Sequence, residues 1–199
     1  MMLSRPVYVA AAAALAVALA AGIALMPLAR AQSSPSSPVV TAVPSASAGT
    51  ALPKGDVAFM KQAAQNGQLE VQGSQLALGK TSTAEVKAFA QQMVTDHTAA
   101  GDELKALAGA KGVKLSAEPS LMQKAKLKLL GARDGAGFDK HYVDDIGISA
   151  HQDTIKLFRK VAEQSGDADI KAFASKTLPT LEHHLSMARA LKVQTDSRP

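Results

Sequence analysis

Val86-Lys87-Ala88-Phe89-Ala90 is the stretch that decides the fold, because it returns with a single change as Ile170-Lys171-Ala172-Phe173-Ala174. Each copy opens a segment in which apolar residues recur at intervals of three and four, as on one face of a helix. Each segment also carries a histidine on that face, His97 in the first and His184 in the second. A repeated helical unit of this kind predicts two helical hairpins packed about a pseudo-two-fold axis.

The rest of the pattern predicts four long helices and no β-strands. Alternating apolar runs and Asn-Gly or Asp-Gly hairpin turns between β-branched segments are missing from the sequence. We expect an N-cap at Asp56 for the first helix and a capping box from Ser82 and Glu85 for the second. Gly166 and Asp167 give a stop and a start between the last two helices. Pro179 predicts a kink in the fourth helix. The expected ranges are 56–78, 82–108, 138–162 and 167–191.

A long connection, 109–137, separates the two hairpins and contains a short helical pattern beginning near Pro119. A short turn, a long crossover and a second short turn are the connectivity of ferritin-like bundles. The predicted fold class is therefore all-α: a ferritin-like four-helix bundle of two helical hairpins joined by a long crossover that contains a short helix.

The first 31 residues predict an export signal. An apolar run at 7–28 follows Arg5, and the small-x-small sequence Ala29-Arg30-Ala31 suits a signal peptidase that cuts before Gln32. The alternative is an uncleaved membrane anchor, because about 20 apolar residues span a bilayer. Both alternatives put the remaining chain in the periplasm, either free or anchored at the inner membrane and facing the periplasm.

Composition divides the remaining chain into three parts. Residues 32–54 are rich in Ser, Pro and Ala and predict a disordered linker. Residues 55–193 form the predicted bundle domain, and 194–199 a short tail.

The chain has no cysteine, which excludes disulfides and thiolate metal sites. Beyond residue 31 there are 20 Lys and Arg against 17 Asp and Glu, and the chain has no Trp, which argues against a nucleic-acid partner. The only membrane contact predicted is through residues 7–28, if they are not removed.

Each predicted long helix places one polar residue on its apolar face. Glu70, His97 and His184 fall inside their apolar stripes, and His151 falls toward the edge of its stripe. Their distances along the chain from the hairpin turns place all four near the middle of the bundle. Three other polar residues are predicted to face solvent: His141, Glu182 and His183.

Three interpretations of these four residues stay open. They could form a buried polar layer without chemistry, in which the histidines hydrogen-bond to Glu70, Ser74 or Tyr142. They could hold one transition metal, since imidazole and carboxylate suit Zn, Fe or Cu. A di-iron site is the third interpretation, but it needs a Glu three residues before each His, and Val94 and Leu181 stand there instead.

Four motifs contain the residues just described: Asn66-Gly67-x-x-Glu70, Met93-Val94-Thr95-Asp96-His97, Phe138-Asp139-Lys140-His141-Tyr142-Val143 with the later His151, and Leu178-Pro179-Thr180-Leu181 with the later His184-Leu185. These motifs resemble an uncharacterised family of exported bacterial proteins, the domain of unknown function numbered 4142. The resemblance covers about residues 56–191. It implies a ferritin-like fold and an envelope location, and it implies no reaction.

No complete catalytic motif is present in the sequence, so an enzyme is not the favoured class. We expect a periplasmic binding or stress-related envelope protein. The alternatives are a metal-binding or redox protein that uses the Glu and His residues, and a helical scaffold for interactions with a partner.

Overall fold

The computed structural model describes residues 51–197, and within this range the chain is helical without a β-strand. The elements in order are α1 Lys54–Lys80, α2 Ala84–Ala110, α3 Leu121–Gly131, α4 Gly135–His141, the π-helix η1 Tyr142–Ala150, α5 His151–Gln164 and α6 Ala168–Asp196. The predicted export signal and nearly all of the predicted linker lie outside the described residues.

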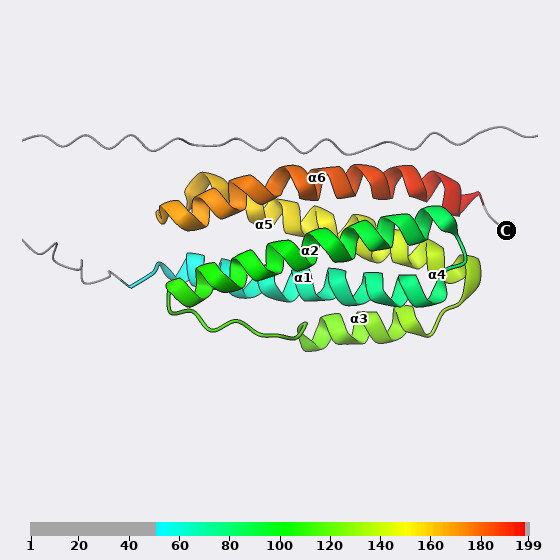
Figure 1. Cartoon of the computed structure of the whole chain (residues 1–199), viewed down its shortest axis with the longest axis horizontal. Helices are drawn as coiled ribbons and strands as arrows, with labels where there is room; N and C mark the ends of the chain where they lie inside the picture. Colours follow the sequence, from blue (N-terminus) through cyan, green and yellow to red (C-terminus); the bar gives the residue numbers. More distant parts are fainter. Residues whose placement is uncertain (1–50, 198–199) are drawn as a thin grey trace, which may run out of the picture. The chain divides into compact units, whose positions relative to one another are not determined.

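The bundle consists of four long rods: α1, α2, a continuous third rod made of α4, η1 and α5, and α6. Figure 1 shows their arrangement. α1 and α2 form one hairpin, and the third rod with α6 forms the other. The crossover carries α3 back along α1, so α2 and the third rod run in the same direction (Figure 1). This confirms the predicted ferritin-like bundle of two hairpins joined by a long crossover with a short helix.

The helix starts were only partly predictable. Asp167 stands at the start of α6 as expected, and its side chain caps the helix by accepting hydrogen bonds from the backbone N–H groups of Asp169 and Ile170. The prediction for α1 was wrong, because the N-cap is Pro53 and the helix begins before Asp56. The side chain of Asp56 instead accepts a 3.0 Å hydrogen bond from the hydroxyl of Ser165, in the turn of the other hairpin.

The predicted capping box of α2 was also wrong. The helix begins at Ala84 with Thr83 at the N-cap, and no side chain caps it. The hydroxyl of Thr83 donates to the carboxylate of Asp139 on α4 at 2.5 Å, which joins the start of α2 to the third rod. A tertiary contact thus replaces the local cap that the motif Ser82-x-x-Glu85 predicts.

The π-helix η1 is the least expected element of the fold. A π-helix closes its hydrogen bonds over five residues instead of four, so it shifts the phase of the residues that follow it. His151 comes directly after η1, and its side chain is 0% exposed instead of lying at the edge of the apolar stripe. Two glycines allow close packing around η1: a Cβ on Gly147 would lie 2.8 Å from Cβ of Ala188, and one on Gly73 would lie 2.9 Å from Cγ1 of Ile146.

Two apolar clusters fill the bundle, one toward each end. The first includes Phe89, Met93, Phe138, Tyr142 and Ile146, among others. The second includes Phe59, Leu104, Phe158, Phe173 and Leu181, among others. The two copies of the repeat therefore place their phenylalanines in different clusters, and the buried polar residues lie between them. Of the helices in residues 51–197, none is long and apolar enough to cross a membrane.

Candidate metal centre

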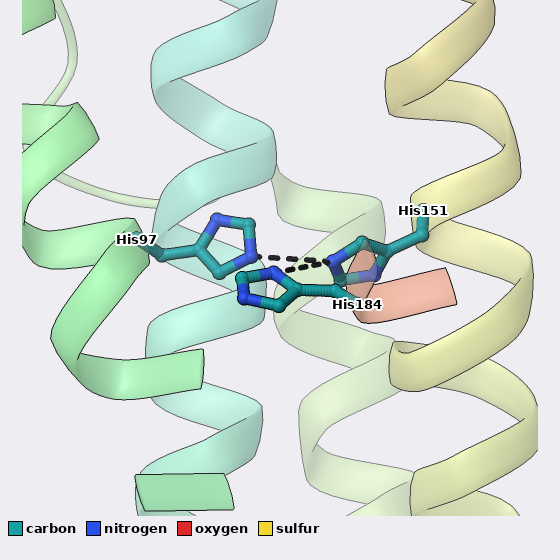
Figure 2. Close-up of side chains that lie close together, drawn as sticks. All are labelled: His97, His151 and His184. Carbon is teal, nitrogen blue, oxygen red and sulfur yellow. Dashed lines mark hydrogen bonds between the residues drawn. The ribbon is translucent and has the colours of Figure 1, made fainter. Parts of the chain in front are cut away.

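Three histidines from three rods meet at the middle of the bundle. Figure 2 shows the rings of His97, His151 and His184 pointing toward one another. Nε2 of His97 lies 3.2 Å from Nε2 of His151, which lies 3.4 Å from Nδ1 of His184. One nitrogen from each ring lies within 4.8 Å of the others, and all three residues are buried. A single ion placed between them could contact all three rings.

The outer nitrogen of each ring has an oxygen partner. Nε2 of His184 donates to Oδ2 of Asp96 at 2.8 Å, and Nδ1 of His151 donates to the backbone oxygen of Ile146 in η1 at 3.0 Å. Nδ1 of His97 lies 3.1 Å from Oε2 of Glu70, within ion-pair distance but without hydrogen-bond geometry. Partners of this kind orient metal-bound histidines in proteins and fix which nitrogen carries the proton.

This arrangement leaves lone pairs facing one another. A neutral imidazole has one N–H and one lone pair, so His151 and His184, which donate outward, turn lone pairs toward each other. If His97 also holds its proton on the Glu70 side, three lone pairs converge. If Glu70 donates to His97, the inner proton of His97 can satisfy His151, and Nδ1 of His184 still has no donor. A bound cation would satisfy all three nitrogens at once.

Burial keeps the three rings neutral. It lowers the pKa of His151 to about 4, and it lowers the pKa values of His97 and His184 from the usual 6.5. The neighbouring histidines depress the pKa of His97 further, whereas the contact with Asp96 partly offsets the effect of burial on His184. Neutral imidazole is the form that binds metals, so the rings need not lose a proton at neutral pH.

Glu70 lies beside the histidines and not among the converging nitrogens. Its Oε1 accepts a 3.3 Å hydrogen bond from Thr154 and lies 3.8 Å from Nδ1 of His151. Its Oε2 is buried and makes no hydrogen bond with any described residue. Burial raises the pKa of Glu70 to about 8. A positive charge between the histidines would favour the ionised carboxylate, because opposite charges stabilise each other strongly in a buried site.

A cavity of about 620 Å³ reaches this centre from one side of the bundle. Its polar walls include Glu70, His97 and Thr154, and Gly67 and Gly101 leave room beside them. Apolar residues form most of the remaining lining, among them Leu104, Val113, Leu115, Phe158, Phe173 and Leu181. The cavity provides a route by which an ion or a small molecule could reach the histidines.

The structure brings together all four residues singled out in the sequence. His97, His151 and His184 contribute the converging nitrogens, and Glu70 contacts the outer nitrogens of two of them. Ser74 and Tyr142, considered above as partners of the histidines, hydrogen-bond to each other at 2.9 Å. The predicted solvent positions of Glu182 and His183 are confirmed, whereas His141 is partly buried.

Two partners in the site were not predicted from sequence. Thr154 donates to Glu70, and the amide of Asn66 donates to Thr154 at 3.1 Å. Asp96 of α2 accepts a hydrogen bond from His184 of α6, although Asp96 directly precedes a different histidine, His97, in the sequence. The spacing of Thr154 three residues after His151 could have placed it on the same face, but no local signal connects Asp96 with His184.

The chain belongs to the family described as a domain of unknown function, DUF4142, whose model matches residues 41–191. This confirms the family resemblance seen in the motifs around Glu70 and the histidines. A comparison with curated proteins found no match.

Two solved structures share the fold. A DUF305 fragment from Deinococcus radiodurans is 11% identical with a TM-score of 0.65, covering 73% of this chain and 99% of its own. A DUF305 protein from Streptomyces coelicolor, described as a presumptive secreted protein, is 15% identical with a TM-score of 0.61. That match covers 72% of this chain and 95% of the other. At these identities the likeness establishes the fold alone.

Proposed function

We propose that this protein binds a single first-row transition metal ion between His97, His151 and His184. The observation that carries the proposal is that the three inner ring nitrogens lie within 4.8 Å of one another. In His151 and His184 the other ring nitrogen donates outward, so their inner nitrogens face each other without a proton. A buried polar layer without a ligand should pair donors with acceptors, and these rings cannot all do so.

The ligand set indicates the class of ion. Three neutral imidazoles suit Zn²⁺, Cu²⁺ and Fe²⁺ and do not suit Mg²⁺ or Ca²⁺, which prefer oxygen ligands. Glu70 supplies a compensating negative charge beside the ion and orients His97. A three-histidine site leaves a further coordination position, and the cavity next to His97 gives a small ligand access to it. The di-iron interpretation loses support, because Glu70 is the only carboxylate among the buried residues of this cluster within residues 51–197.

We further propose that the metal is bound outside the cytoplasm. The apolar run at 7–28 and the cleavage motif that follows it support export, and a structural neighbour is described as a presumptive secreted protein. The protein is then a periplasmic or envelope metal-binding protein rather than an enzyme with a catalytic motif of its own.

The test is the melting temperature of untagged protein with Zn²⁺, Cu²⁺ or Fe²⁺ and with a chelator. A metal at 100 times its dissociation constant stabilises the fold by about 2.7 kcal/mol, so the wild type should melt several degrees higher. His151→Gln should abolish the shift, and His183→Gln is the matched control because His183 is exposed next to His184.

A second variant separates a metal site from a polar layer. Glu70→Leu combined with His97→Leu removes both members of a buried pair and leaves neither unsatisfied. If the residues form only a polar layer, this double variant should be as stable as the wild type, and no metal should shift the melting temperature of either protein. That result would overturn the proposal. Under the proposal, the double variant loses the metal-dependent shift that the wild type shows.

A further inference from the structure

Helix α3 exposes an unusual amount of apolar surface for its length. Three of its 11 residues are large and apolar but lie in solvent: Leu121 is 86% exposed, Met122 71% and Leu129 63%. Elsewhere in residues 51–197, only Val193 is a comparably exposed large apolar residue. A contiguous apolar patch that is exposed on a protein surface marks an interaction site.

The apolar residues form one stripe with lysines on both sides. At about 100° per residue, Leu121, Ala125, Leu129 and Met122 occupy one arc of the helix. The opposite side packs against the bundle through Gln123, Leu127 and Leu130. Lys124 and Lys128 flank the stripe on one side and Lys126 on the other, and α3 contains no acidic residue.

The helix is held so that the stripe faces outward. Figure 1 shows α3 outside the four rods, alongside α1. The side chain of Gln123 donates to Asn66 of α1 at 3.0 Å, and Ser120 with Gln123 forms a capping box at the start of α3. Lys124 pairs with Glu118 at 3.3 Å, whereas Lys126 and Lys128 form no ion pair with any described residue.

We propose that the outer face of α3 docks the protein on the surface of a bilayer that contains anionic phospholipids. A helix with an apolar stripe between lysines lies flat in the interface, with the apolar side chains at the acyl boundary and the ammonium groups near the phosphates. This contact is separate from the segment 7–28, and it does not depend on the metal site.

Charge favours a membrane over a second copy of the chain. If two α3 faces met, their lysines would approach each other with no acidic residue of α3 between them. An anionic lipid surface instead attracts each lysine by about 1 kcal/mol, and the attraction is lost at high salt. The stripe is convex and only 11 residues long, so we expect weak, reversible and salt-sensitive binding.

The experiment measures sedimentation of the protein with vesicles of phosphatidylglycerol and phosphatidylcholine, against vesicles of phosphatidylcholine alone. A chain that begins at Gln32 removes the apolar run and keeps the compact unit Ser47–Pro199 whole. We expect binding to the anionic vesicles only. We also expect release in 0.5 M salt, because the Debye length falls from about 8 Å at physiological ionic strength to roughly 4 Å, which screens the lysines from the phosphates.

Two triple variants test the two parts of the surface. Leu121→Ser with Met122→Ser and Leu129→Ser removes the apolar stripe, and Lys124→Gln with Lys126→Gln and Lys128→Gln removes the charges. Each should weaken binding at least about tenfold. The controls are Val193→Ser for exposed apolar area, and Lys87→Gln with Lys105→Gln and Lys160→Gln for the loss of three exposed charges.

All substituted side chains of α3 are exposed, so every variant should melt close to the wild type, which excludes loss of folding as the cause. The proposal is overturned if the wild type does not bind anionic vesicles, or binds neutral vesicles equally well. It is also overturned if either α3 variant binds like the wild type. Sedimentation velocity without lipid adds one more outcome: a wild-type dimer that the serine variant dissolves, without vesicle binding, would assign the stripe to a second copy instead.

Discussion

Asp96 on α2 accepts a 2.8 Å hydrogen bond from Nε2 of His184 on α6, so a partly exposed carboxylate determines which nitrogen of a buried histidine faces the centre. The contact also joins the two hairpins. Loss of such an outer partner lowers metal affinity by about 10- to 100-fold, because the ring is no longer held in one tautomer and orientation. We therefore predict that Asp96→Ala raises the dissociation constant for Zn²⁺ at the proposed site by this factor, as measured by competition with a chromogenic chelator.

Asp102→Ala is the matched control for this prediction. Asp102 is an exposed acidic residue on the same helix, so its removal changes the net charge equally. Equal affinities of the two variants would show that Asp96 acts only through its charge and does not position His184.

The buried ionisable groups predict a stability maximum near pH 6.5 for the metal-free protein. Below this value the histidines of the unfolded chain take up protons, whereas the folded protein holds His151 neutral down to about pH 4. The pKa values of His97 and His184 are lowered in the same direction. The folded state then binds fewer protons than the unfolded state, so stability falls as the pH drops below 6.5.

Glu70 acts in the opposite direction, and its effect dominates above pH 6.5, where the histidines are mostly neutral in the folded and the unfolded chain. Its pKa rises from 4.5 to about 8 on folding, so its stabilising contribution is complete below pH 4.5 and is lost as the pH rises through 8. Urea unfolding in a chelator should show a decline of up to about 2 kcal/mol between pH 6.5 and 8. Glu70→Gln should remove this decline, and an unchanged profile in that variant would mean that another group causes it.

Close packing at the π-helix can be tested with glycine substitutions. Gly147→Ala places a Cβ 2.8 Å from Cβ of Ala188, so η1 and α6 must separate. We expect a loss of about 1–3 kcal/mol in the free energy of unfolding. Gly101→Ala is the control, because its Cβ would meet nothing within 4 Å and should stabilise α2 by about 1 kcal/mol. Similar values for the two variants in chemical denaturation would show that η1 has room to adjust.

The two phenylalanines of the repeat should contribute comparably to stability. Phe89 is 1% and Phe173 4% exposed, and each lies in an apolar cluster next to other aromatic rings. Truncation of either to Ala should cost about 3 kcal/mol or more in urea unfolding. A cost under about 1 kcal/mol for one of them would mean that its half of the bundle tolerates a cavity by collapsing around it.

Helical periodicity made most of the fold and much of the site predictable. Glu70, His97 and His184 occupy the apolar faces of their helices in sequence and are buried in the structure. The position of His151 was less well predicted, because η1 rotates the residues that follow it around the helix axis. No residue pattern in this segment predicts a π-helix. The starts of α1 and α2 differ from prediction. The carboxylate of Asp56 and the hydroxyl of Thr83 hydrogen-bond to the other hairpin, and no local pattern predicts these contacts.

The amino-acid sequence alone determined which side chains face the core, because the repeat of 3.6 residues is a local property of each helix. It also determined that His97, His151 and His184 lie at similar heights in the bundle. Only the tertiary structure decided which nitrogen of each ring faces the centre and that Glu70 lies behind the rings. These features depend on how four helices are displaced and rotated against one another. They also depend on two partners of the rings: Asp96, which is far in sequence from His184, and Ile146, which lies in the π-helix before His151.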